Sequence, residues 1–390
     1  MRHINTAERR DRLGVRHFAS LASADPIAVA GSMVGLHSSD PATVYLSLQA
    51  RLPEFNRPDL ETAMYEDREL LRLLGMRRTM FVVPHDLGAV MDAGCTRALA
   101  AAERRRTVKM VTEHGLTTDG EAWIDDVSSR TMAAIRERGE ALATELRDEV
   151  PELALKIQFG DGRKWAGAVG ISTRILFLLA TEGHIMRGRP RGTWLSSQYR
   201  WSAVADWIGA ELPTLDRAAS QAELLRRWLR QFGPGTMTDL KWWTGWTVRD
   251  TKAALAAVEA VEVELDEATG FVLPDDLEPT TASRPWAAFL PGLDSTPMGW
   301  KERTWFLGSH QDALFDRNGN IGPTVWANGR IVGAWGQRDG GIVLYRLLET
   351  VTRAEQKLID AKRDRLEDWL GGTVVMPRFP APLQKELAAR

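Results

Sequence analysis

Apolar side chains recur at helical spacing through the first sixty-five residues, and short polar segments separate the runs. The pattern predicts helices over residues 6–20, 26–33, 41–52 and 58–65. Two short apolar runs follow and meet near Gly75, which predicts a β-hairpin over residues 70–84. The stretch over residues 85–150 is patterned mainly as helix. The first part of the chain therefore has the order of helices followed by a hairpin.

The same order recurs twice farther along. Residues 172–182 predict a helix that ends at Gly183, and residues 185–195 predict two strands around a turn rich in Gly, Pro and Arg. Residues 221–232, 240–244 and 248–258 then predict three helices, with Thr236 as an N-cap and Asp239 at the capping-box position. Strands at residues 261–265 and 271–273 complete the third unit. Helices followed by a hairpin are typical of a winged helix, so we expect three of them in tandem.

The last hundred residues change to short alternating strands. These are expected at residues 286–290, 324–327, 330–337 and 341–346, with a tight turn at Asn328-Gly329 and a closing helix over about 353–369. A small β-barrel or β-sheet fits this pattern. The predicted fold is α+β. Its domains are a first winged helix with a helical extension over residues 1–150, a second with a basic wing over 151–215, a third over 216–280 and a β-rich part over 281–390.

Composition narrows the class of protein. The chain has 390 residues, of which 44% are hydrophobic and 26% charged, as in ordinary globular proteins. Cys95 is the single cysteine, which excludes an internal disulfide framework. An apolar window long enough to cross a membrane is absent, and the first ten residues are polar, unlike a secretory signal. We therefore expect a cytoplasmic protein with no membrane partner.

Local charge is more informative than the net charge of −2. A run at Arg104–Arg106 with Lys109 has the pattern of a solvated helix face. A second basic group is interleaved with Gly, Pro and aromatic residues in the second wing, which is not a helix-face pattern; it comprises Arg187, Arg189, Arg191 and Arg200. Because only local clusters act within a Debye length of a phosphate, this wing is the predicted nucleic-acid contact.

The segment before the third expected helix carries the candidate chemistry. His37, Ser38, Ser39 and Asp40 are consecutive, and Pro41 follows. We expect Asp40 to be the N-cap and Pro41 the first helical residue. Neutral His37 can accept a proton from water through one ring nitrogen, and Ser39 can hold the same water. The ordinary histidine pKa near 6.5 predicts that this neutral form is lost below about pH 6.

Five sequence blocks together resemble the family of winged-helix DNA glycosylases that includes AlkZ and YcaQ. They are GLHSSDP with YLSLQARL from Gly35, the hairpin at Arg72–Val83, FGPGTMTDLKWWTGW at 232–246, FLPGLDS at 289–295 and IGPTVWANGRIVGAWGQR at 321–338. The blocks span nearly the whole chain in the family's order. The resemblance implies three winged helices and a β-barrel in a C-shaped body around double-stranded DNA.

The resemblance also implies an activity. Members of this family excise bulky N-alkylated purines, including interstrand crosslinks made by natural-product antibiotics. Their catalysis is monofunctional, since water displaces the base and no lysine Schiff base forms. The family's wing equivalent to residues 187–193 contacts the lesion-bearing DNA. The implied roles are alkylation repair by base excision, or self-resistance to a genotoxic antibiotic.

This chain departs from the family at its catalytic motif. The family has Q-x-Q or Q-x-D where His37 and Ser39 stand here. The candidate catalytic residues are therefore His37, Ser39 and Asp40, whose charge can favour an oxocarbenium-like sugar although capping competes for its oxygens. The candidate DNA contacts are Arg187, Arg189, Arg191, Arg200 and Arg78.

Loss of both glutamines leaves three outcomes open: an enzyme with a different catalytic pair, an altered range of lesions, or a tandem winged-helix DNA-binding protein without catalysis. A further alternative is a protein that sequesters a DNA-reactive metabolite on a tryptophan-lined concave face. Metal-binding and nucleotide-binding motifs do not occur, so neither a metal nor a cofactor is expected. The expected partner is double-stranded DNA, bound by a monomer.

Overall fold

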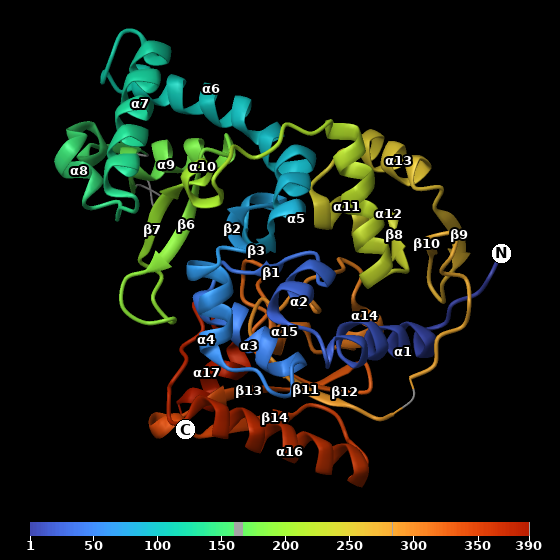
Figure 1. The fold of residues 1–390 in the computed structure, drawn as a ribbon. Helices are drawn as coiled ribbons and strands as arrows, with labels where there is room; N and C mark the ends of the chain where they lie inside the picture. The colour runs from blue at the N-terminus through green and yellow to red at the C-terminus, as the bar shows by residue number, and fades with distance from the viewer. Residues whose placement is uncertain (160–166, 283, 390) are drawn as a thin grey trace.

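The computed structural model describes residues 1–159, 167–282 and 284–389 (Figure 1). After α1 (Thr6–His17), a first repeat of six elements begins. It contains α2 (Pro26–Ser32), β1 (Leu36–His37), α3 (Pro41–Arg51), α4 (Arg57–Glu61), β2 (Leu70–Leu74) and β3 (Met80–Pro84). The three strands are antiparallel in the order β1-β3-β2. α2 and α3 both begin with an Asp N-cap followed by Pro, because the carboxylate accepts a free backbone N–H and proline lacks one.

A third repeat, at the right of Figure 1, has the same order of elements. It contains α11 (Arg217–Phe232), β8 (Gly235–Thr236), α12 (Met237–Thr244), α13 (Val248–Ala257), β9 (Val261–Glu264) and β10 (Thr269–Val272). Its strand order, β8-β10-β9, matches that of the first repeat. Thr236 and Asp239 form the predicted capping box at the start of α12.

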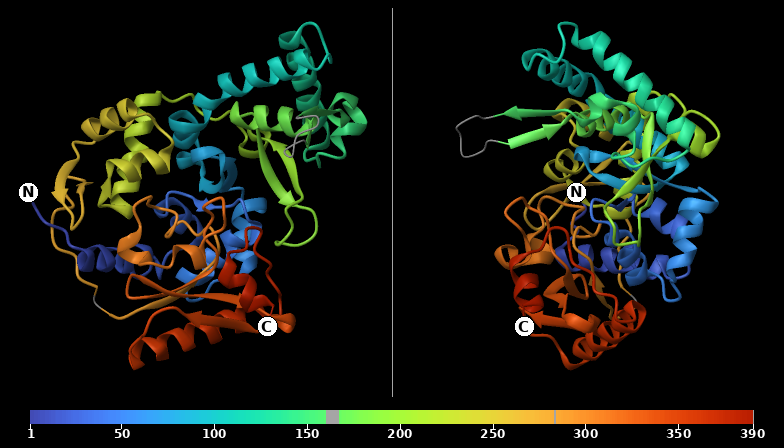
Figure 2. Two further views of the ribbon diagram at one scale, coloured as in Figure 1. Left: turned by 180° about the vertical axis from the view of Figure 1, so that it is seen from behind. Right: turned by 90° about the vertical axis from the view of Figure 1, so that its left-hand side faces the viewer.

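The second repeat, at the upper left of Figure 1, follows the same plan with an insertion. It contains α7 (Gly120–Arg138), α8 (Leu146–Glu149), α9 (Ile171–Thr181), β6 (Ile185–Pro190) and β7 (Tyr199–Ala203). Ala141 bridges Trp201 of β7 and takes the place of the short first strand. The inserted hairpin of β4 (Lys156–Phe159) and β5 (Gly167–Gly170) projects from the molecule (Figure 2). Residues 160–166 of the expected second domain lie outside the described part.

Two details of the second repeat correct the sequence prediction. Both strands of the basic hairpin were expected within residues 185–195, but the returning strand is β7, at Tyr199–Ala203. The strand register shifts between Arg187 and Pro190, and a loop follows before β7 pairs, so the arginine-rich stretch forms one strand and the loop.

The expected boundary at residue 150 does not separate the hydrophobic cores. A second core takes buried residues from Leu74 to Ala203, including Ile124, Val127 and Ile135 of α7. α7 thus packs with the second repeat rather than extending the first. α5 (His85–Met91) and α6 (Arg97–Glu113) connect the two repeats, and α10 (Val204–Ile208) follows β7. Periodicity shows that a helix has an apolar face but does not identify the partner of that face.

The C-terminal part is a four-stranded antiparallel sheet covered by helices. The strands are β11 (Ala287–Leu290), β12 (Thr324–Ala327), β13 (Arg330–Gln337) and β14 (Val343–Leu347), paired in that order. α14 (Thr304–Leu307) and α15 (Gln311–Leu314) lie in the β11–β12 connection, and α16 (Arg353–Leu370) and α17 (Pro382–Ala388) follow the sheet. The predicted Asn328-Gly329 turn has positive φ at both residues, 46° and 79°. The pairing describes a sheet with β11 and β14 at its edges.

The largest core joins the first repeat, the third repeat and the C-terminal sheet. Aromatic side chains fill much of it: Trp228, Phe232 and Trp300 stack or meet edge-on, and His17 of α1 contacts two of them. Most tryptophans of the described residues are buried, namely Trp194, Trp207, Trp228, Trp243, Trp246, Trp300, Trp305, Trp326 and Trp335. The candidate segment before α3 is therefore attached to a rigid body.

Candidate functional site

The segment from Leu36 to Asp40 begins as strand β1 (Leu36–His37) and continues through a bend at Ser39 and Asp40 into the N-terminus of α3. His37 pairs with Phe81 of β3, and the backbone N–H of Ser38 donates to the carbonyl oxygen of Met80 at 2.7 Å. The hydroxyl of Ser38 meets Arg72, whereas the backbone N–H of Ser39 faces the imidazole of His37.

The imidazole of His37 is buried and neutral. Only 3% of the residue is exposed, and its ring meets Phe81 edge-on with the centroids 5.3 Å apart. Burial first and the charge of Arg77 second lower the pKa of His37 to about 3, and Asp294 opposes them only in part. Charging this ring thus requires removing it from an environment that disfavours any cation. The expectation that His37 becomes protonated near pH 6 is wrong for this environment.

The hydrogen bonds of His37 indicate its tautomer. The backbone N–H of Ser39 points to Nδ1 across 3.5 Å, so Nδ1 is the acceptor and the proton resides on Nε2. Nε2 makes no hydrogen bond within the residues that the structure describes. His37 accordingly offers a neutral N–H donor, as the side-chain amide of glutamine does.

Ser39 is the more accessible member of the pair. Its residue is partly exposed, and its hydroxyl accepts only a long hydrogen bond, 3.4 Å, from the backbone N–H of Met80. The hydroxyl keeps its own proton and a lone pair for another partner.

Asp40 serves as the N-cap of α3, as the sequence predicted. One carboxylate oxygen accepts the N–H of Ala42 at 3.1 Å, and the other accepts the N–H of Arg378 at 2.8 Å. Burial raises the pKa of Asp40, and these two hydrogen bonds partly offset that rise. Both oxygens are committed to backbone groups, so this carboxylate positions the helix.

Ser38 connects the segment to a buried arginine of β2. Arg72 donates through Nε to the hydroxyl of Ser38 at 2.8 Å, and through its terminal nitrogens to the hydroxyl of Tyr65 and the carbonyl of Gly188. Its guanidinium also lies over the ring of Tyr199, 4.5 Å from the centroid. This cation therefore joins the candidate loop to both strands of the basic hairpin, with neutral groups as its partners.

The arginines of that hairpin occupy different environments. Arg187 lies over the rings of Tyr199 and Trp201 at 5.4 and 5.3 Å, and burial lowers its pKa. Arg189 pairs with Glu66 at 2.5 Å, whereas Arg191 is exposed in the loop. Of the three, Arg191 is thus the most exposed, although Arg189 keeps 41% of its side chain exposed despite its ion pair.

The structure brings only some of the predicted residues together. Arg187 joins the His37 segment indirectly, through Tyr199 and Arg72. Arg200 follows Tyr199 in β7 and so points to the opposite face, where it lines a surface hollow with Arg138 and Glu140. Arg78 lies at the β2–β3 turn and pairs with Glu103 of α6. These two form no part of the His37 cluster.

Three arginines of this region were missed by sequence reasoning. Arg72 interrupts the apolar run Leu70–Leu74, and a charge inside a buried strand was a usable signal. Arg77 affects the pKa of His37 and lies 3.9 Å over the ring of Trp242. Arg378 touches Asp40 from 338 residues away, and no local pattern marks such a contact.

Two further properties of the described residues concern metal ions and membranes. Among the described residues, no group of three or more His, Cys, Asp or Glu side chains is arranged to hold a metal ion. In the same part of the chain, every helix is too short or too polar to cross a membrane.

Comparison with known proteins supplies the family. The model of the family described as "DNA glycosylase AlkZ-like" matches residues 30–369. The chain belongs to the AlkZ-like DNA glycosylase family. Among solved structures, it is similar to the Streptomyces sahachiroi DNA glycosylase AlkZ, with a TM-score of 0.72 and 18% sequence identity over 97% of this chain and 99% of that one. A search of curated protein sequences gave no match. At this identity, the structural likeness to AlkZ establishes the fold.

Proposed function

We propose that this protein is a monofunctional DNA glycosylase that hydrolyses the N-glycosidic bond of bulky or cationic alkylated purines in double-stranded DNA. Membership of the AlkZ-like family supports a glycosylase role. The observation that carries the proposal is His37, a neutral imidazole with a free Nε2–H, at the position where the family has its first catalytic glutamine. Ser39 stands at the position of the second, with its backbone N–H facing the imidazole of His37.

An alkylated purine is a good leaving group, so the enzyme needs to supply little acid catalysis. Alkylation at N7 or N3 leaves the base positively charged, so the bond from C1′ of the sugar breaks with its electron pair going to the purine. Water then bonds to C1′, and its proton is lost to solvent. The protein has to orient that water and stabilise the cationic sugar.

His37 and Ser39 are suited to orienting water rather than to removing its proton. A base whose pKa is about 3 attracts a proton weakly near neutral pH, so general-base catalysis by His37 is disfavoured. In the inferred tautomer, Nε2–H donates to the water oxygen and the Ser39 hydroxyl accepts one of the water's protons. This revises the role expected for His37 from the sequence, from proton acceptor to water-positioning donor.

The repeated topology supports the DNA-binding half of the proposal. The first and third units share the order helix, strand, helix, helix, strand, strand and one strand order. The second follows the same plan, with the isolated bridge at Ala141 in place of the first strand and the β4–β5 hairpin inserted. We assign all three as winged helices, whose wings and second or third helices are standard DNA contacts. The β6–β7 wing displays Arg191 to a phosphate, while Arg187 is stacked on its own aromatic residues. The ion pair with Glu66 reduces what Arg189 can contribute.

Single-turnover base release tests the proposal. The substrates are duplex DNA with one 7-methylguanine and duplex DNA with a bulky N7-alkylpurine. We expect release by the wild type, a rate about 100-fold lower for His37→Ala, and retained activity for His37→Gln, which restores the family's residue. Asp40→Asn is the control at the helix cap, because asparagine keeps one acceptor oxygen for the N–H of Ala42 while removing the charge.

The possible outcomes separate an enzyme from a binding protein. Duplex binding without base release by the wild type, on either substrate, would contradict the proposal. If the double variant His37→Gln/Ser39→Gln then released base, the missing activity of the wild type would be due to the replacement of the family's two glutamines alone. The wild type would then be a non-catalytic DNA-binding protein. Full activity in His37→Ala would remove His37 from the mechanism.

A further inference from the structure

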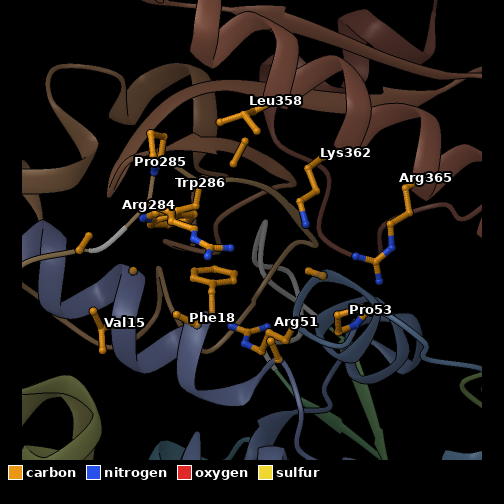
Figure 3. A pocket seen from close by; sticks show the side chains of 16 residues that line it. Val15, Phe18, Arg51, Pro53, Arg284, Pro285, Trp286, Leu358, Lys362 and Arg365 are labelled. Carbon is orange, nitrogen blue, oxygen red and sulfur yellow. The ribbon is translucent and has the colours of Figure 1, made fainter.

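A cavity of about 370 Å³ lies at the C-terminal end of α3, away from the His37 segment. Side chains from α1, the last turn of α3, α16 and the segment before β11 line it (Figure 3). α3 has 11 residues, so roughly 16 Å separate the two ends of this helix. This volume is within the range of small-molecule sites. The cavity is therefore a separate feature from the candidate catalytic site.

The charged side chains around this cavity are all basic. They are Arg51, Arg284, Lys362 and Arg365, and no Asp or Glu lines it among the described residues. Figure 3 shows Lys362 and Arg365 extending from α16 toward the space that Phe18 and Arg51 border from below. The charge of Arg51 is balanced by the buried carboxylate of Asp294, and the other three cations create a positive potential in a recess, where low-dielectric walls strengthen it.

The four cations differ in how far they are already satisfied. Arg51 is paired with Asp294 at 2.7 Å, with both side chains fully buried, but its Nε is buried and has no partner in the described part of the chain. Arg365 donates to the carbonyl oxygens of Gln49 and Leu52. Lys362 forms neither a hydrogen bond nor an ion pair with any described residue, and it is only partly exposed. Arg284 also has no such partner among the described residues but is exposed, so the partly buried ammonium of Lys362 is the group best placed to receive an anion.

Aromatic rings form the opposite wall. Phe18 and Trp286 are in contact, with ring centroids 4.4 Å apart and an interplanar angle of 31°. Aliphatic side chains complete this side; they are Val15, Ala19, Ala22, Ala50, Pro53 and Leu358. Such a wall favours a flat apolar body and offers it few hydrogen-bond partners.

We propose that this cavity binds a small planar aromatic anion, with its ring against Phe18 and Trp286 and its carboxylate or phosphate oxygens on Lys362. The shared chemistry is one flat ring system bearing one compact anionic group, and it fits an aromatic acid as well as a nucleoside monophosphate. The purine that a glycosylase of this family releases is neutral, because it keeps the electron pair of the broken bond, so it lacks the anionic group that Lys362 would bind. The proposal therefore does not depend on the proposed glycosylase activity.

Calorimetric titration of the full-length protein tests this site. The probes are 2-naphthoate, its uncharged counterpart 2-naphthamide, and deoxyadenosine 5′-monophosphate. For a ligand of this size we expect 2-naphthoate to bind with a Kd of roughly 10 µM to 1 mM, and the amide at least about tenfold more weakly. Binding of the nucleotide would show that the cavity accepts aromatic phosphates as well as aromatic carboxylates.

Variants locate the binding. Lys362→Gln is expected to weaken 2-naphthoate binding about tenfold or more, because a charge-assisted contact is lost, and Lys362→Arg to retain most of it. Lys357→Gln removes an exposed charge from the same helix and should leave the Kd unchanged. Trp286→Leu should weaken the binding of both anions, 2-naphthoate and the nucleotide. Equal binding of acid and amide, unchanged binding in Lys362→Gln, or no saturable binding of either anion would overturn the proposal.

Discussion

Protonation of His37 is predicted to oppose folding. The structure places the pKa of this ring at about 3, against 6.5 for an ordinary histidine. A difference of about 3.5 units corresponds to about 5 kcal/mol between the two protonation states. Because the unfolded chain takes up a proton near pH 6.5 and the folded chain does not, acidification favours unfolding. The folded state keeps its full stability with respect to His37 above pH 6.5. This contribution to the free energy of unfolding is lost as the pH falls from 6.5 toward 3.

The magnitude can be measured where few other groups change. At pH 5, about 1.5 units below the ordinary histidine value, His37 should lower the free energy of unfolding by about 2 kcal/mol. His37→Gln removes this contribution, so its stability should decline less between pH 7 and pH 5 than that of the wild type. Burial first and the charge of Arg51 second lower the pKa of His17 to about 3 as well, so His17→Gln should remove a similar share of the pH dependence.

Two assays test this reasoning. Urea unfolding of the wild type and of His37→Gln at several pH values measures the difference in slope. NMR of protein labelled with ¹⁵N-histidine measures the titration directly, and the His37 signal is the one that His37→Gln removes. Titration of that signal at pH 5.5 or above would refute the burial argument, as would equal pH slopes for the two proteins. Base release, if confirmed, should then show no histidine-dependent decline above about pH 4.

Three further predictions concern the framework of the site. Asp294→Asn should destabilise the protein by about 3–5 kcal/mol in urea unfolding, since it leaves the fully buried Arg51 without its counter-charge; a loss under about 1 kcal/mol would contradict this. Asp40→Ala should lower stability by about 1 kcal/mol or more and Asp40→Asn by less, because asparagine keeps one acceptor oxygen for the N–H of Ala42 but turns an NH2 toward the N–H of Arg378; equal thermal midpoints of the wild type and Asp40→Ala would argue against the cap. Gly235→Ala should cost about 3 kcal/mol, because its Cβ would lie 2.3 Å from the buried ring of Trp228; wild-type stability would show that the ring moves freely.

Local chemistry made several elements predictable. Asp40 followed by Pro41 predicted the start of α3, because a carboxylate acceptor and a ring with fixed φ act within one helical turn. The Thr236–Asp239 capping box was predictable for the same reason. Strands β12 and β13 were expected at their observed bounds, since Asn-Gly between two apolar runs favours a tight hairpin.

Other features depended on segments far apart in the chain. The packing of α7 on the second repeat could not be derived from its own periodicity, which places an apolar face without naming what covers it. Arg72 meets Ser38, Tyr65 and Gly188 only because three strands converge. The cavity beside Lys362 likewise needs α1, α3 and α16 together.

The candidate site shows where the two kinds of information meet. The sequence by itself identified His37, Ser39 and Asp40 and the family whose motif they replace, and it predicted correctly that Asp40 caps a helix. The tertiary structure decided that His37 is buried beside Phe81 and Arg77, and so neutral far below its ordinary pKa. Capping depends on atoms a few residues apart in the chain. A pKa depends on the desolvation and charges that the whole fold brings around a group, which no local pattern encodes.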